Sequence, residues 1–126
     1  MRKMLLASVL AATTIATGQA ALAQPNQCFF VSQWEGWKAP DDHTIYLNII
    51  GHRIYRLDLA GACPELTWPD VHLVSRIRGG DTICRPLDFD LKVAEQRGGP
   101  ATPCIVKNMT LLTPDEAAAL PRDARP

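Results

Sequence analysis

The sequence predicts a mainly β domain, a small antiparallel barrel or sandwich of about six short strands with a short C-terminal helix. Short apolar or alternating segments recur along residues 28–112, and turns containing glycine or proline separate them. All ten prolines lie after residue 23. A helix-start signal stands near the C-terminus. For the β part we favour a closed or partly open barrel of the oligonucleotide/oligosaccharide-binding type.

Residues 1–23 predict a secretory signal peptide. Arg2 and Lys3 form the positively charged region, residues 4–15 are apolar or small, and residues 21–23 read Ala-Leu-Ala. This order is typical of a bacterial signal sequence that is cleaved between Ala23 and Gln24. The apolar segment is too short for a stable membrane anchor. We therefore expect a periplasmic or secreted protein with no membrane span after cleavage.

The remaining chain predicts one disulfide-stapled β domain over residues 24–120, followed by a disordered tail over residues 121–126. After cleavage, 11 basic residues stand against 13 acidic residues. No basic stripe is present, which argues against binding to nucleic acid or to an anionic membrane surface.

Four cysteines, Cys28, Cys63, Cys84 and Cys104, predict two disulfides in an exported domain of this size. Their spacing does not match a zinc site or a redox motif. Four cysteines allow three connectivities, and spacing does not decide among them. We favour Cys63 with Cys84, which brackets the strand at 71–77, and Cys28 with Cys104, which would tie the first strand to the last.

The first half of the domain predicts three strands. Residues 28–34 are aromatic and β-branched, and residues 43–50 alternate between apolar and polar, as in a half-buried strand. The alternation resumes at residues 53–57. Gly51 and His52 stand between the two alternating segments, which predicts a hairpin with a two-residue type II′ turn.

The second half predicts strands at residues 71–77, 87–93 and 104–112. Gly79 and Gly80 predict a tight turn, and Pro86 favours an edge position or a bend. The segment 87–93 alternates, with Leu87, Phe89, Leu91 and Val93 expected inward and Asp88 and Asp90 expected outward.

The segment after the last strand predicts a short helix. Thr113 suits the N-cap, Pro114 the first helical position and Glu116 the third, which together form a capping box. Alanines follow, and Pro121 ends the helix after about two turns.

Several acidic and histidine side chains could hold a metal ion, but each has an ordinary structural explanation. Asp88 and Asp90 share the solvated face of a strand, and Asp41 and Asp42 suit a turn before His43. His52 and His72 are expected at the surface, since no paired histidine motif supports a metal centre. A metal-handling protein that uses the histidines with these carboxylates is therefore an alternative function.

The tryptophans are the one feature that favours binding. Trp34, Trp37 and Trp68 could form a stacking surface for a ligand, while core packing is the competing explanation for them. No motif of a known catalytic class occurs, so we expect neither an enzyme nor a cofactor. The favoured function is a binding or structural module of the cell envelope, whose unknown partner is a protein or a glycan. Inhibition of an envelope enzyme is a further alternative.

Five segments in a fixed order carry a resemblance to a known family. They are residues 41–47 (DDHTIYL), 53–59 (RIYRLDL), 61–66 (GACPEL), 83–88 (ICRPLD) and 103–106 (PCIV). With the four cysteines they resemble a family of small exported bacterial proteins classed as a domain of unknown function. The resemblance covers residues 28–120 and consists of cysteines, turn glycines and strand residues. It implies a four-cysteine framework, and because the family has no assigned activity or catalytic residues, no functional residue carries over from it.

Overall fold

The computed structural model describes residues 27–77 and 80–126. The predicted signal peptide with its cleavage site at Ala23, and Gly79 of the predicted Gly-Gly turn, lie outside the described residues. In the described part of the chain, no helix is both long enough and apolar enough to span a bilayer.

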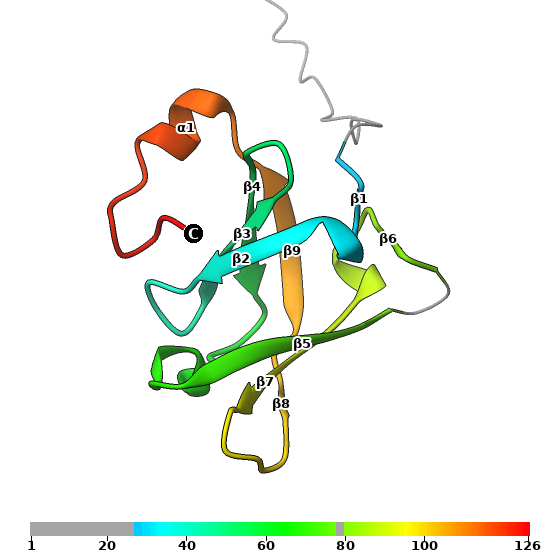
Figure 1. Cartoon of the computed structure of the whole chain (residues 1–126), viewed down its shortest axis with the longest axis vertical. Helices are drawn as coiled ribbons and strands as arrows, with labels where there is room; N and C mark the ends of the chain where they lie inside the picture. Colours follow the sequence, from blue (N-terminus) through cyan, green and yellow to red (C-terminus); the bar gives the residue numbers. More distant parts are fainter. Residues whose placement is uncertain (1–26, 78–79) are drawn as a thin grey trace, which may run out of the picture.

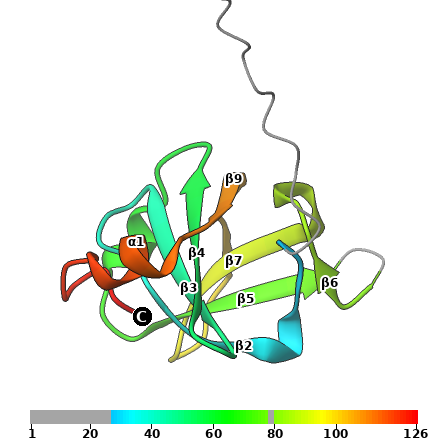
Figure 2. The same cartoon turned by 90° about the horizontal axis from the view of Figure 1, so that it is seen from above.

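The chain is mainly β and its strands pair antiparallel, as predicted, but the described residues form nine short strands rather than six. A four-stranded sheet has the order β2 (Trp34–Lys38), β3 (Thr44–Ile49), β4 (Arg53–Leu59) and β9 (Val106–Leu111). A three-stranded sheet has the order β5 (Val71–Ile77), β7 (Phe89–Glu95) and β8 (Thr102–Pro103). The strands β1 (Phe29–Phe30) and β6 (Thr82–Ile83) form a small third sheet (Figures 1 and 2).

The predicted barrel or sandwich is confirmed as a sandwich and not as the favoured barrel, because the sheets of the described residues remain separate and sandwich-like. A closed barrel would require every edge strand to pair, whereas β2 pairs with β3 alone and β5 with β7 alone. Two 3₁₀ helices interrupt the ladders: η1 (Val31–Gln33) and η3 (Pro86–Asp88). The strand predicted at residues 28–34 is split by η1, because β1 pairs in one sheet and β2 in another.

The core lies between the two larger sheets. Along β3, Ile45, Leu47 and Ile49 are fully buried, and Tyr55 and Leu57 of β4 lie opposite two of them. The inner face of β7 supplies its alternate apolar residues to the same core: Phe89, Leu91 and Val93. The alternation in the sequence thus identifies the inward faces of β3 and β7.

The outer face of β3 is also buried, which corrects the prediction of a half-buried strand. Thr44 is 8% exposed and Tyr46 is 9% exposed. The C-terminal segment, predicted to be disordered over residues 121–126, folds back beside β2 and β3 in both views (Figures 1 and 2). Ala124 in it is only 2% exposed, and the Arg125 guanidinium donates to the carbonyl of Leu120 at 2.8 Å. Buried apolar contact at Ala124 and the hydrogen bonds of Arg125 to the carbonyls of Leu120 and Ala118 hold the segment in place.

The predicted hairpin joins β3 and β4, but its turn differs from the predicted type. Ile49 lies opposite Arg53, which leaves Ile50, Gly51 and His52 in the loop. Both Gly51 (φ 87°) and His52 (φ 59°) have positive φ. A type II′ turn has positive φ at its first central residue only, so the two-residue type II′ prediction is wrong. Histidine tolerates this backbone region better than most residues, which allows it to follow the glycine.

The C-terminal helix α1 (Pro114–Ala118) begins as predicted. The Thr113 hydroxyl accepts from the Glu116 N–H at 3.2 Å, and the Glu116 carboxylate accepts from the Thr113 N–H at 2.8 Å. This reciprocal pair is a capping box, and it satisfies two backbone donors that the helix leaves without partners.

Two disulfides join the four cysteines, but the favoured connectivity is wrong. The structure pairs Cys28 with Cys84 and Cys63 with Cys104. Strand register explains both pairs. In the small sheet Phe29 lies opposite Ile83, which places Cys28 beside Cys84 with 4.2 Å between their Cα atoms.

The second disulfide follows from the pairing of β4 with β9. Leu59 lies opposite Val106, and the Ala60 N–H donates to the carbonyl of Ile105 at 2.8 Å. The segments that continue from these strands therefore run side by side as far as Cys63 and Cys104. The favoured pair of Cys28 with Cys104 assumed that the first and last strands lie side by side, whereas β1 pairs with β6 and β9 with β4.

Candidate functional site

Two of the three candidate tryptophans line one groove, although they come from different parts of the chain. Trp37 lies on the edge strand β2, and Trp68 directly follows the 3₁₀ helix η2 (Pro64–Thr67). Together with Val71 at the start of β5 they line an open groove of about 430 Å³. Trp68 is 48% exposed, whereas Trp37 is half-buried against the core. We call this the tryptophan groove.

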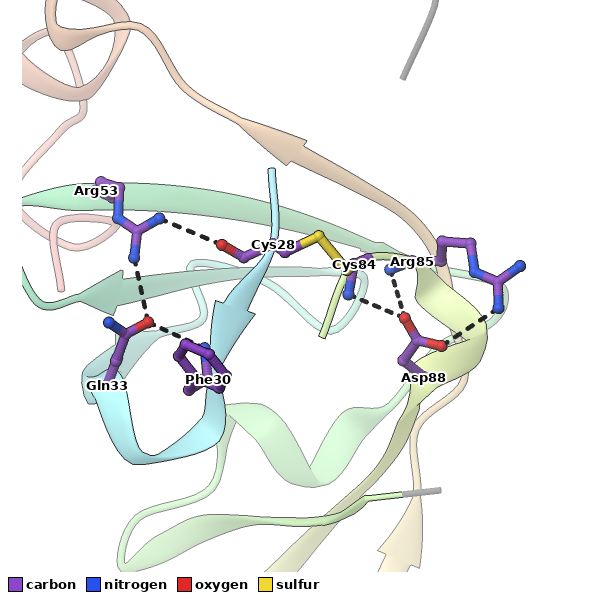
Figure 3. The surroundings of a disulfide bond; sticks show 7 residues. All are labelled: Cys28, Phe30, Gln33, Arg53, Cys84, Arg85 and Asp88. Carbon is purple, nitrogen blue, oxygen red and sulfur yellow. Dashed lines mark hydrogen bonds and ion pairs between the residues drawn. A yellow bond between two sulfur atoms is a disulfide. The ribbon is translucent and has the colours of Figure 1, made fainter. Parts of the chain in front are cut away.

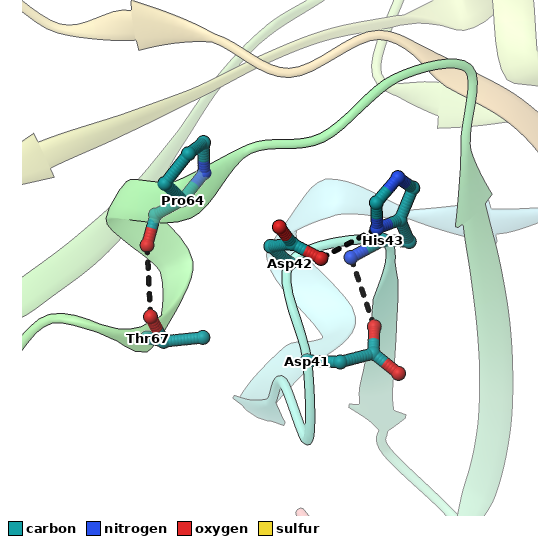
Figure 4. Close-up of polar contacts among 5 residues, drawn as sticks. All are labelled: Asp41, Asp42, His43, Pro64 and Thr67. Atoms are coloured by element: carbon teal, nitrogen blue, oxygen red, sulfur yellow. Dashed lines mark hydrogen bonds and ion pairs between the residues drawn. The ribbon is translucent and has the colours of Figure 1, made fainter.

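The position of Trp68 is set by a well-anchored turn. Cys63 is the N-cap residue of η2 and is held in the disulfide with Cys104, while Leu66 in the turn is buried. The Thr67 hydroxyl donates to the carbonyl of Pro64 at 2.9 Å (Figure 4), and the Trp68 N–H donates to the carbonyl of Glu65 at 3.1 Å. The exposed indole therefore stands on a turn fixed by a covalent link and a buried side chain.

Trp34 lies at a neighbouring groove and has a more structural role. Its indole Nε1–H donates to the carbonyl of Gly36 at 2.9 Å, and the ring packs against the core. Trp34 and Trp37 line this second groove of about 220 Å³ together with His72 and Leu73 of β5. The two grooves thus share Trp37 and run between β2 and β5, which are edge strands of different sheets.

The loop before β3 brings together Asp41, Asp42 and His43, whose candidate ligand atoms lie within 4.8 Å of one another. The Asp41 carboxylate accepts from the His43 N–H at 2.8 Å, and Asp42 Oδ1 lies 2.5 Å from His43 Nδ1 (Figure 4). These contacts are those of an aspartate-stabilised turn, the structural role predicted for the loop. The histidines and the more distant carboxylates named as candidates do not join it, since the group is limited to these three among the described residues.

Asp88 does not lie on a solvated strand face, as predicted, but in the 3₁₀ helix η3. Its Oδ2 atom accepts from the backbone N–H groups of Cys84 and Arg85, both at 2.9 Å (Figure 3). The carboxylate therefore fixes the segment that carries the Cys28–Cys84 disulfide. These hydrogen bonds, led by the one from Cys84, hold the pKa of Asp88 below its ordinary value of 3.8. Asp90 follows on β7 and is partly exposed.

Leu87 is 78% exposed, although the alternation predicted it inward. The 3₁₀ turn that Pro86 begins delays the strand, so the buried series keeps its predicted phase but starts at Phe89 instead of Leu87. Leu87 and Ile105 (71% exposed) border a groove of about 240 Å³ near the Cys63–Cys104 disulfide. Pro86 was the signal in the sequence that the strand starts later than its pattern suggests.

Removal of the Asp88 carboxylate should loosen the Cys84 segment. We expect Asp88→Ala to lower the free energy of unfolding by about 1 kcal/mol, because two backbone donors lose their partner. The carboxylate stabilises the folded state while it is ionised. Its contribution is therefore present above the ordinary pKa and is lost as the pH falls through the lower folded-state pKa. Urea unfolding at several pH values checks this, and equal curves for both proteins between pH 2 and pH 5 would contradict it.

Comparison with known proteins identifies a family. The model of a family described as "Family of unknown function (DUF6491)" matches residues 2–126. No curated protein and no solved structure matches the chain.

Proposed function

Since the chain belongs to the Family of unknown function (DUF6491), whose description assigns no activity, we propose from its surface that it is a non-enzymatic binding module of the cell envelope. It contacts an envelope protein or glycan through the tryptophan groove. The observation that carries the proposal is that Trp37 and Trp68, distant in sequence, line one groove, with Trp68 48% exposed.

The groove has the physical properties of a recognition surface. Tryptophan is among the residues that most often dominate binding energy, because it offers a large contact area at a small entropic cost. Trp68 stands on a turn anchored by Cys63, so little conformational freedom remains to be lost when a partner binds. A preformed groove with one exposed and one half-buried tryptophan supports a binding role over a purely structural one.

An envelope location is part of the same proposal. Disulfides form and persist in oxidising compartments such as the periplasm or the extracellular space. The two disulfides and the predicted signal peptide over residues 1–23 both support a periplasmic or secreted protein. The partner should accordingly be sought among envelope components.

Loss of Trp68 should abolish partner binding without unfolding the domain. We expect Trp68→Ala to reduce capture of the partner from a solubilised envelope fraction by about tenfold or more, as for a hot-spot residue. The measurement is quantitative mass spectrometry of proteins retained by immobilised wild type and variant, with co-sedimentation on purified peptidoglycan as the glycan arm.

The matched control is Leu87→Ala, which removes another exposed apolar side chain from a different groove. Circular dichroism should show that both variants remain folded. If Trp68→Ala and wild type retain the same proteins and the same peptidoglycan, the tryptophan groove is not the binding surface.

Two other functions are alternatives to the binding module. An inhibitor of an envelope enzyme would use the same groove, with an enzyme as the partner. A metal-handling protein has only the Asp41–Asp42–His43 loop to support it, and the polar atoms of that loop already bond to one another. The binding role is therefore the stronger proposal.

A further inference from the structure

Three grooves adjoin one another around Trp68. Trp68 lines the tryptophan groove and also a separate groove, which is lined by Glu65 and Glu95 as well and differs from the groove at Trp34. Asp70 lines the tryptophan groove and a third groove, which it shares with Glu95. The grooves therefore form a continuous surface, which we call the acidic tryptophan face, defined by Glu65, Trp68, Asp70, Glu95 and Asp123.

Negative charge dominates this face. Its four carboxylates stand against two cations in the same grooves, Lys38 and Arg97. Asp70, Glu95 and Asp123 are exposed. None of the ion pairs within residues 27–77 and 80–126 includes any of the four carboxylates. An exposed indole thus shares its grooves with carboxylates that form no ion pair in the described part of the protein.

An indole ring that shares its grooves with carboxylates suits an organic cation. The face of tryptophan is the best aromatic partner for a lysine or arginine cation, and carboxylates form charge-assisted hydrogen bonds with both groups. A neutral sugar would stack on the indole but would leave the excess negative charge without a role. The charge of the face therefore complements a positively charged partner.

The neighbouring strands favour a polypeptide as the source of that cation. Within the described residues β5 pairs with β7 alone and β2 with β3 alone, so each has a backbone edge that pairs with no other strand. The tryptophan groove lies between these edges, because Trp37 belongs to β2 and Val71 to β5. An extended peptide can hydrogen-bond to such an edge while its side chains enter adjacent grooves.

We propose that the acidic tryptophan face binds an extended basic segment of a partner protein, with a lysine or arginine side chain on Trp68 and its charged end near Asp70 and Glu95. This inference rests on the proposed binding function and specifies the chemistry of the partner. It gives the face a preference for positive charge that an aromatic groove alone would not have.

Charge-matched peptides test the inference. The probes are a fluorescein-labelled nine-residue peptide that alternates lysine and threonine, and the same peptide with glutamate in place of lysine. Fluorescence anisotropy with the whole folded protein measures their affinities. We expect the lysine peptide to bind about tenfold tighter or more, and its affinity to fall as salt rises from about 50 to 300 mM.

Paired variants locate the effect. We expect Asp70→Asn with Glu95→Gln to weaken binding of the lysine peptide by about fivefold, and Trp68→Ala by about tenfold. Asparagine tolerates the positive φ of 58° at position 70. The control, Asp90→Asn with Asp115→Asn, makes the same change in net charge away from the face and should alter the affinity less than about twofold.

Two results would overturn the inference: equal affinity for the lysine and glutamate peptides, or no effect of Asp70→Asn with Glu95→Gln. Tighter binding of a neutral chitooligosaccharide than of the lysine peptide would overturn it as well, in favour of a glycan. In each case, loss of partner capture by Trp68→Ala would leave the proposed binding function standing. If Trp68→Ala alters neither peptide binding nor partner capture, both proposals fail.

Discussion

Replacement of Cys63 and Cys104 together by alanine is expected to lower the free energy of unfolding by about 3–5 kcal/mol. The disulfide joins the start of η2 to the segment before β9 across 41 residues, so its loss greatly increases the freedom of the unfolded chain. Both cysteines are buried, at 2% and 3% exposure, so alanine also leaves a void in the core. Domains of this size have total stabilities of about 5–15 kcal/mol, which makes this loss a large fraction.

Urea unfolding followed by tryptophan fluorescence measures the change. The matched control is Cys28→Ala with Cys84→Ala, which removes a disulfide of similar separation, 56 residues, at a partly exposed position. We expect the control to retain more stability than the Cys63 and Cys104 variant.

Non-reducing peptide mapping of the wild type should recover Cys28 linked to Cys84. Recovery of Cys28 linked to Cys104 would show that the pairing described here is wrong.

Truncation of Tyr55 to alanine is expected to cost about 3–5 kcal/mol of stability. Tyr55 lies on β4, is 0% exposed and packs against Phe29 with 4.8 Å between the ring centroids. Its hydroxyl has no hydrogen-bond partner among the described residues. Removal of that hydroxyl alone should therefore not destabilise the protein. We expect Tyr55→Phe to leave the free energy of unfolding unchanged or to raise it by about 1 kcal/mol.

The pH dependence of the free energy of unfolding provides a second comparison of the wild type with Tyr55→Phe. Burial raises the pKa of Tyr55 above its ordinary value of 10.0, with a smaller opposing effect from Arg53. Above pH 10 the unfolded chain loses this proton before the folded chain does, so the wild type loses stability as pH rises toward the folded pKa. Tyr55→Phe should lack this part of the decline in urea unfolding between pH 9 and pH 11. A loss of several kcal/mol in Tyr55→Phe at neutral pH would mean that the hydroxyl has a partner.

Features that depend on neighbouring residues could be predicted from the sequence. The capping box at Thr113 and Glu116 needs residues three apart, and the hairpin after Ile49 needs a glycine between two alternating segments. The inward series of β7 followed from alternation once the strand had begun at Phe89. The alternation alone placed the start of that strand at Leu87, and only Pro86 signalled the later start.

Features that depend on distant residues could not be predicted. The disulfide partners follow from the pairing of β1 with β6 and of β4 with β9, and no spacing in the sequence encodes those ladders. The same holds for the candidate site, since Trp37 and Trp68 meet only because β2 and η2 come together in space. The carboxylates around Trp68 carry no mutual spacing that a sequence motif could reveal. The sequence identified the three tryptophans as candidates, and the structure showed that Trp37 and Trp68 line one groove.

The connectivity of the cysteines has a consequence for how the chain is oxidised. The two disulfides interlock along the sequence, because Cys63 lies between Cys28 and Cys84, and Cys84 lies between Cys63 and Cys104. Joining each cysteine to the next along the chain yields neither native bond. A chain oxidised in that order must exchange both bonds through mixed-disulfide intermediates before β1 can pair with β6. For a chain oxidised in that order, maturation requires disulfide isomerisation as well as oxidation.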